Sequence, residues 1–163
     1  MDFLSNQTSF KGSLMPFLQE RLEAGQRIRH VRFRGISMLP MLRQGKDSVD
    51  LAPVPERLKK YDLPVYLRSD GQYVMHRVIK VKEDHYVCLG DNTIELEYVY
   101  PEQVIGVVCA FHRGERKIEV NSFWYRMYCK VWQFTWPFRV FLRKVRILSV
   151  KILKKIGKLL DKL

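Results

Sequence analysis

The run Tyr-Val-Met-His-Arg-Val-Ile-Lys-Val at residues 73–81 consists largely of residues that favour β-strands, and it follows a hairpin turn signal, Ser-Asp-Gly-Gln, at residues 69–72. Alternation along this run places His76 on the same face as Val74 and Val78, which we expect to be the core face. Similar short runs recur through the middle of the chain, at residues 29–34, 49–51, 64–67, 85–89, 104–111 and 117–120. Their spacing predicts a compact domain of mainly antiparallel β-structure.

Helical patterns flank this β-rich region on both sides. Residues 13–24 carry an apolar stripe, with Ser13 placed to cap the helix, Pro16 in its first turn and Gly25 at its end. After residue 121 the apolar residues again follow helical spacing, and Pro137 is expected to start or kink a second helix there. We therefore expect three parts: a short N-terminal helical segment at 1–26, a β-rich domain at 27–120 and a helical tail at 121–163.

Positive charge is concentrated in the last part of the chain. The 163 residues carry a net charge of +12, and 47% of them are apolar, which is enough for a hydrophobic core. Residues 1–120 hold 18 Lys and Arg against 16 Asp and Glu, whereas residues 121–163 hold 11 against one acid, Asp161. The tail therefore predicts an anionic partner.

The remaining composition predicts a protein without disulfides, metal or cofactor. Three cysteines without paired spacing, Cys88, Cys109 and Cys129, indicate free thiols and suit a reducing compartment. No CxxC or HxxxH pattern indicates a metal site, and we interpret His30, His85 and His112 as solvated surface groups. The N-terminus lacks the features of a secretory signal, and no stretch of the tail is apolar enough to span a bilayer. We expect a cytoplasmic protein.

The tail pattern is typical of a helix that lies on a membrane surface. Its apolar residues recur at i, i+3 and i+4, Lys and Arg fill much of the opposite side, and Trp124, Trp132 and Trp136 suit the headgroup level. Packing against the domain or a partner helix is one alternative, and nucleic-acid binding is another. Nucleic acid is disfavoured because it would leave the apolar stripe exposed. We expect residues 124–163 to hold the protein at the inner, anionic face of the membrane.

A candidate nucleophile lies in the motif Gly-Ile-Ser-Met-Leu-Pro at residues 35–40. Gly35 permits a tight turn after a strand, and the residues from Ser37 onward resemble the cap and first turns of a short helix. Backbone N–H groups and the helix dipole at such a position would stabilise a developing oxyanion. The same frame also suits a serine that only caps a helix.

His76 and Asp91 are the candidate partners of this serine. A serine hydroxyl needs a base, and a neutral imidazole suits this task near neutral pH, although a histidine on a core face is also often purely structural. A buried carboxylate can fix the imidazole tautomer and stabilise the imidazolium. Asp91, in the loop sequence Gly-Asp-Asn at residues 90–92, is the first candidate for that role. Glu95 and Glu97 are nearby alternatives, and a loop aspartate often only forms an Asx-turn.

Together, these segments resemble the signal peptidase I and LexA-like superfamily of serine peptidases, over about residues 28–110. The matches follow the family's order: the nucleophile box at 35–40, an apolar strand at 58–67, the base box at 76–78, the acidic box at 90–92 and a closing strand at 104–108. A histidine at the base position is similar to the Ser-His branch found in archaeal and endoplasmic-reticulum signal peptidases. In that branch a second acid follows the acidic box, and Glu97 stands near its place.

The resemblance implies a partly barrel-like catalytic fold and a small stand-alone serine endopeptidase of bacterial type. Ser37 and His76 would form its catalytic dyad, oriented by Asp91 or a nearby glutamate, and would process an extended peptide of signal, leader or propeptide type. The membrane anchor of signal peptidases and the DNA-binding motif of LexA-like repressors have no counterpart before Ser37. The alternatives are a peptide-binding pseudoprotease without activity and a self-cleaving regulator. No metal and no cofactor are implied.

Overall fold

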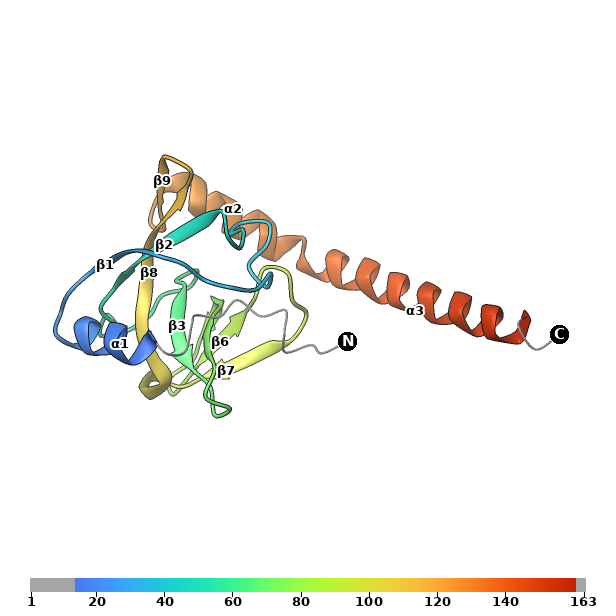
Figure 1. The fold of residues 1–163 in the computed structure, drawn as a ribbon, viewed down its shortest axis with the longest axis horizontal. Coiled ribbons are helices and arrows are strands. Elements are labelled where there is room, and N and C mark those ends of the chain that lie inside the picture. The colour runs from blue at the N-terminus through green and yellow to red at the C-terminus, as the bar shows by residue number, and fades with distance from the viewer. Residues whose placement is uncertain (1–13, 161–163) are drawn as a thin grey trace. The chain divides into compact units, whose positions relative to one another are not determined.

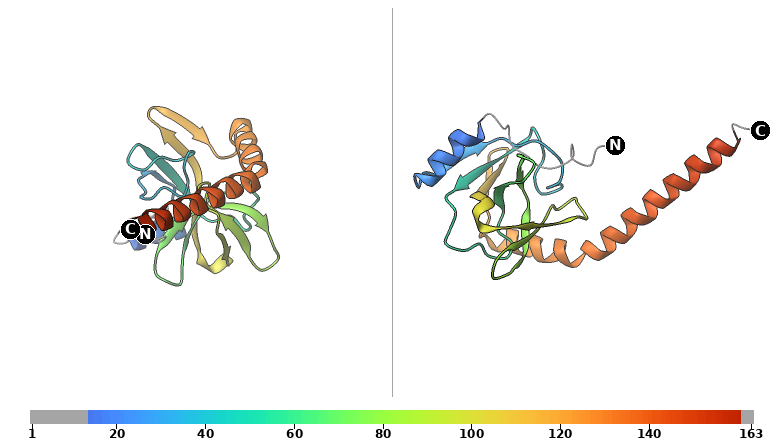
Figure 2. Two further views of the ribbon diagram at one scale, coloured as in Figure 1. Left: turned by 90° about the vertical axis from the view of Figure 1, so that its right-hand side faces the viewer. Right: turned by 90° about the horizontal axis from the view of Figure 1, so that it is seen from below.

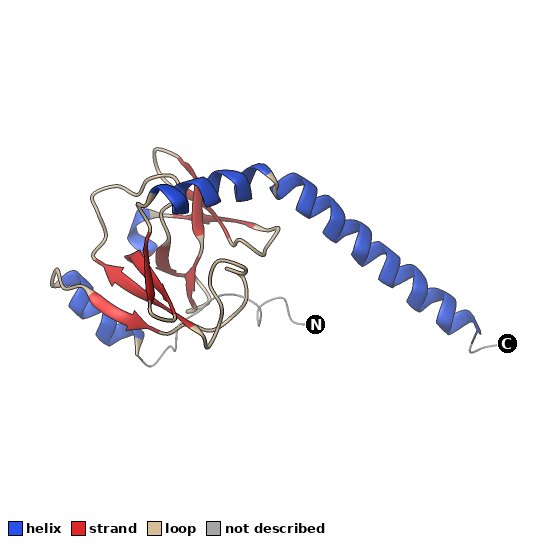
Figure 3. Ribbon diagram, turned by 90° about the horizontal axis from the view of Figure 1, so that it is seen from above, coloured by secondary structure: helices blue, strands red, loops and turns tan. Residues whose placement is uncertain are grey.

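The computed structural model describes the backbone of residues 14–160, and the chain forms two compact units, Met1–Cys129 and Lys130–Leu163 (Figure 1). All the described strands lie in the first unit, between the helical parts of the chain (Figure 3). The helices are α1 (Met15–Glu23), the short 3-10 helix η2 (Pro101–Gln103), α2 (Phe123–Phe134) and α3 (Trp136–Leu160).

The strands form two antiparallel sheets. The six-stranded sheet has the order β1-β2-β8-β3-β4, with β9 paired to β8, and the three-stranded sheet has the order β5-β6-β7. Their bounds are β1 (Ile28–Val31), β2 (Asp47–Ala52), β3 (Pro64–Leu67), β4 (Tyr73–Met75), β5 (Arg77–Val81), β6 (Tyr86–Leu89), β7 (Leu96–Val99), β8 (Val104–Arg113) and β9 (Arg116–Glu119). The predicted mainly β class, with antiparallel sheets, an N-terminal helix and C-terminal helices, is confirmed. Within the described range the strands form no closed barrel (Figure 2).

The run at residues 73–81, predicted as one strand, is divided between the two sheets at His76. Strand β4 ends at Met75 and pairs with β3 in the larger sheet, whereas β5 begins at Arg77 and pairs with β6 in the smaller sheet. The predicted core face is confirmed, because His76 and the residues two positions away on either side are fully buried: Val74 and Val78. His76 therefore lies at the point where the chain passes from one sheet to the other.

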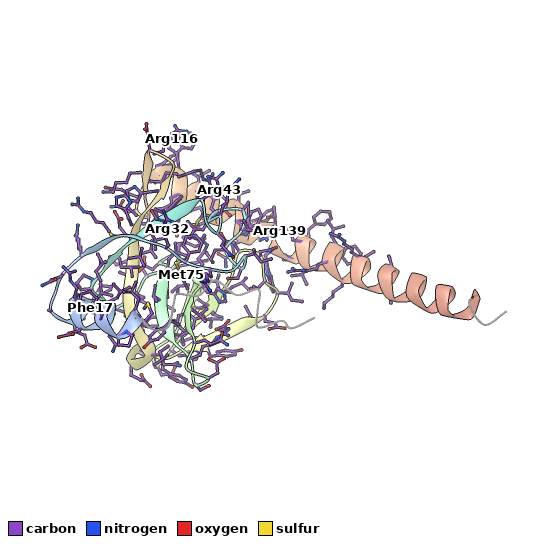
Figure 4. All side chains as sticks on the ribbon, viewed as in Figure 1. Phe17, Arg32, Arg43, Met75, Arg116 and Arg139 are labelled. Carbon is purple, nitrogen blue, oxygen red and sulfur yellow. The ribbon has the colours of Figure 1, made fainter. Side chains whose placement is uncertain are left out.

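A hydrophobic core joins α1 to the larger sheet. The buried face of α1 belongs to the same cluster as Met75, and Phe17, on another side of the helix, is exposed (Figure 4). Gly106 in β8 permits close packing, because a Cβ atom there would lie 2.8 Å from Leu22 Cδ1. Helix α1 is thus part of the β-rich unit, although the sequence suggested a separate segment at 1–26. The residues of α1 that form this face are Met15, Leu18 and Leu22.

Proline and glycine mark the helix ends as predicted. Pro16 lies in the first turn of α1, and Gly25, with a φ of +80°, follows its end. Leu14 occupies the N-cap position, and the predicted cap Ser13 lies outside the described residues. Pro137 is the second residue of α3, so it starts this helix. Over residues 14–160, no helix is long and apolar enough to cross a membrane.

Candidate active site

The structure brings Ser37 and His76 together. Ser37 lies in the loop that follows β1, and its Oγ atom is 3.0 Å from Nε2 of His76. Both residues are buried, with exposed fractions of 1% for Ser37 and 0% for His76. This distance allows a hydrogen bond between the hydroxyl and the imidazole, as a serine nucleophile and its base require.

The loop that carries Ser37 forms consecutive turns, and the short helix expected after this serine is absent from it. Its backbone hydrogen bonds run from Leu39 N to Ile36 O and from Leu42 N to Met38 O. Pro40 favours turns at this point, because proline disfavours the helical conformation in the residue before it. A helix dipole at Ser37, which we expected to stabilise an oxyanion, is therefore not part of this site.

The loop after β6 lies directly against the Ser37 loop. The backbone N–H of Asn92 donates to the carbonyl oxygen of Ser37 over 2.6 Å. At Gly90 a Cβ atom would lie 2.9 Å from Ser37 O and 3.0 Å from His76 Nε2. Glycine is therefore the residue that lets this loop approach both members of the dyad.

The carboxylate that contacts His76 belongs to Glu97. Its Oε1 atom lies 3.0 Å from His76 Nδ1, and Tyr66 donates its hydroxyl to Oε2 over 2.7 Å. Arg68 donates from Nε to the same oxygen over 2.9 Å, and a second contact joins the Arg68 guanidinium to Oε1. A proton on Nδ1 that is donated to Glu97 leaves the Nε2 lone pair directed at Ser37, the tautomer that a general base needs.

Glu97 is held in its charged form. Burial opposes ionisation, but hydrogen bonds from His76 and Arg68 outweigh it and lower the pKa of Glu97 to about 2. The carboxylate therefore stays negative throughout the pH range in which a neutral imidazole acts as a base. A fixed negative charge beside Nδ1 also stabilises the imidazolium that forms when His76 takes a proton.

Asp91, the first candidate to orient His76, instead pairs with Arg77. The Arg77 guanidinium donates from Nε to Oδ1 over 2.9 Å and from Nη2 to Oδ2 over 2.7 Å, and Tyr128 donates its hydroxyl to Oδ2 over 3.0 Å. Adjacent residues of an extended chain point to opposite sides, so a carboxylate on Arg77 does not reach the imidazole of His76. The third candidate, Glu95, is exposed.

Arg77 connects this site to α2 and to the Ser37 loop. It is only 2% exposed, and its guanidinium contacts the Tyr125 hydroxyl, Cys129 Sγ at 2.8 Å and Met41 Sδ at 2.9 Å. Burial opposes its charge, but Asp91 raises the pKa of Arg77 well above its ordinary value. The first turns of α2, which we predicted as the beginning of the tail, are therefore anchored in the β-rich unit.

The sequence pointed to Ser37 and His76 but missed the residues that hold Glu97. Strand β7, which carries Glu97, was not predicted. Tyr66 lies in the predicted strand 64–67, and it is fully buried in a hydrophobic cluster that includes Val74, Val78 and Cys88. No spacing in the sequence links the residues that hold Glu97, Tyr66 and Arg68, to His76.

No family model, no curated protein and no solved structure matches this chain.

The Asp91–Arg77 pair predicts a large stability loss in Asp91→Asn. Removing one partner leaves the charge of Arg77 buried without compensation, which costs about 3–5 kcal/mol. Urea unfolding followed by circular dichroism measures this loss in the free energy of unfolding.

Asp84→Asn is the matched control, because Asp84 pairs with His85 at an exposed position. An exposed pair contributes little to stability, so this variant should unfold close to the wild type. Equal unfolding free energies for Asp91→Asn and Asp84→Asn would contradict the structural role given to Asp91.

Proposed function

We propose that this chain is a serine endopeptidase in which Ser37 is the nucleophile, His76 the general base and Glu97 the group that orients the base. The observation that carries the proposal is the continuous line of contacts from Ser37 Oγ to His76 Nε2, and from His76 Nδ1 to Glu97 Oε1, each with a distance of 3.0 Å. The resemblance of the surrounding motifs to signal peptidase I and LexA-like peptidases supports it.

The contacts suit an acyl-enzyme mechanism. His76 Nε2 takes the proton of Ser37 as Oγ attacks the peptide carbonyl, and the same proton then passes to the leaving amine. A water molecule subsequently gives a proton to Nε2 and its oxygen attacks the ester, which releases the acid product and restores the Ser37 hydroxyl. Glu97 remains ionised throughout and stabilises the imidazolium in both steps.

The substrate would be an extended peptide. Strand β4 is the last strand of the larger sheet and ends at Met75, next to His76. A peptide that pairs with a sheet edge is held by backbone hydrogen bonds, and side-chain pockets then select its sequence. Because Ser37 is 1% exposed, residues around it must move aside before an external peptide reaches Oγ.

We further propose that the C-terminal helices hold the enzyme on an anionic membrane surface. On α3, exposed apolar residues recur at helical spacing, and basic residues alternate with them. Burial of this stripe in the headgroup region and attraction of Lys and Arg to anionic lipid act in the same direction. Among the residues of α3 whose burial the structure describes, the exposed large apolar ones are Phe138, Phe141, Leu142, Val145 and Leu148.

Cleavage of a peptide library, followed by mass spectrometry, tests the peptidase proposal. We expect cleavage by the wild type, and a loss of at least about 1,000-fold in both Ser37→Ala and His76→Ala, because the two residues act as one unit. The assay is run with and without anionic vesicles.

Ser69→Ala and His85→Ala are matched controls, since Ser69 is exposed and His85 pairs with Asp84. Both should retain wild-type cleavage. Cleavage that survives in folded Ser37→Ala would exclude Ser37 as the nucleophile. Peptide binding without cleavage by any form would favour the pseudoprotease.

Vesicle co-sedimentation tests the membrane proposal separately. We expect the wild type to bind vesicles that contain phosphatidylglycerol more tightly than neutral vesicles, and added salt to weaken this binding. Replacing both Phe138 and Phe141 by Ser should weaken binding by at least about tenfold, because two large apolar side chains are lost from the contact.

Phe17→Ser is the control, because Phe17 is an exposed phenylalanine on α1, in the first unit. It should bind vesicles as the wild type does. Equal binding to neutral and anionic vesicles, or wild-type binding by the double variant, would contradict the membrane proposal.

A further inference from the structure

Three potential metal ligands lie together at one end of the larger sheet. His30, Asp50 and His112 offer ligand atoms that all lie within 4.8 Å of one another. They come from the neighbouring strands β1, β2 and β8, and none of them belongs to the Ser37, His76 and Glu97 site. The two histidines, which the sequence suggested were separate surface groups, have ring centroids only 4.2 Å apart.

The spacing of the ligand atoms is close to that of a zinc site. His112 Nε2 lies 3.0 Å from Asp50 Oδ1. Ligands at about 2.0–2.1 Å from a tetrahedral zinc ion lie about 3.3 Å from one another. To hold such an ion, the His112–Asp50 pair must open slightly, and any wider pair of ligand atoms, at most 4.8 Å apart, must close. Asp50 is 5% exposed and His30 is exposed, which gives the cluster one fixed buried carboxylate and one side open to solvent.

The backbone of β1 is distorted where it supplies His30. The pairing of β1 with β2 is irregular between Ile28 and Val31, and His30 has a φ of +55°, in the left-handed region that residues other than glycine seldom adopt. Such an irregularity redirects a side chain relative to a regular strand. The His30 backbone N–H also donates to Asp50 Oδ1 over 3.0 Å, which holds the bulge against the buried carboxylate.

We propose that His30, Asp50 and His112 bind a divalent transition metal ion, for which zinc is the best match. Two imidazoles and one carboxylate form a ligand set that zinc accepts, with a fourth position left for water. The ion would fasten β1, the edge strand of the larger sheet, to β2 and β8. Because the Ser37 loop directly follows β1, the ion would also fix the start of that loop. This proposal departs from our expectation of a chain without metal, and it does not depend on the proposed peptidase activity.

Zinc titration of the metal-free, untagged full chain tests the site. The protein is treated with a chelator, exchanged into buffer and titrated with zinc in competition with a chromophoric chelator. We expect one zinc ion per chain, and at least about a 100-fold loss of affinity in His30→Gly and in His112→Ala, more than is typical when only a neighbour of a ligand is removed. Cobalt, added in place of zinc, should give the visible absorption of a tetrahedral site in the wild type but not in His30→Gly or His112→Ala.

The variants are chosen so that a loss of zinc binding can be distinguished from a loss of the folded structure. Glycine accepts the left-handed backbone of position 30, and circular dichroism checks both variants. His85→Ala is the matched control, because His85 also pairs with an aspartate, at 2.7 Å, but lies outside the cluster. It should bind zinc as the wild type does. Wild-type affinity no greater than that of His30→Gly, or an equal loss in His85→Ala, would overturn the proposal and leave a simple His112–Asp50 ion pair.

Discussion

The site depends on the passage of one extended segment from the larger sheet to the smaller sheet at His76. Consecutive side chains of an extended backbone point to opposite sides, so His76 contacts Ser37 while Arg77 contacts α2 and, through Met41, a later part of the same loop. Each side then has its own carboxylate: Glu97 at the imidazole and Asp91 at the guanidinium. The charge of Arg77 can be buried beside the imidazole of His76 because each of the two groups has its own carboxylate partner.

This separation of charges also assigns different tasks to the two sides. The Glu97 side would serve the proposed chemistry, since Tyr66 and Arg68 hold the carboxylate that lies beside His76 Nδ1. The Arg77 side is structural, because its contacts join the beginning of α2 to the rest of the unit and, through Met41, to the segment that follows Ser37. Burying the charge of Arg77 costs desolvation free energy. In return, its contacts hold the neighbouring segments in fixed positions, as the proposed serine and its base require.

The sequence was sufficient for the strand-rich class, the helix ends at Gly25 and Pro137, and the pairing of Ser37 with His76. The sequence was insufficient for contacts between side chains that depend on which strands become neighbours in the fold. Glu97 and Asp91 are both acids near the same loop, and only the passage between the sheets determines which of them meets the imidazole. The cluster of His30 and His112 was missed for the same reason, because these residues lie 82 positions apart and are brought together by β2, between their strands.

The most direct measurement is the turnover of Glu97→Gln and Asp91→Asn on one cleaved peptide, at a temperature where both variants remain folded. We expect kcat to fall by about 100- to 10,000-fold in Glu97→Gln, because the imidazole loses its orienting charge. We expect a change of less than about tenfold per folded molecule in Asp91→Asn, since that carboxylate does not contact the base. The reverse order, with Asp91→Asn inactive and Glu97→Gln active, would contradict the assignment of Glu97.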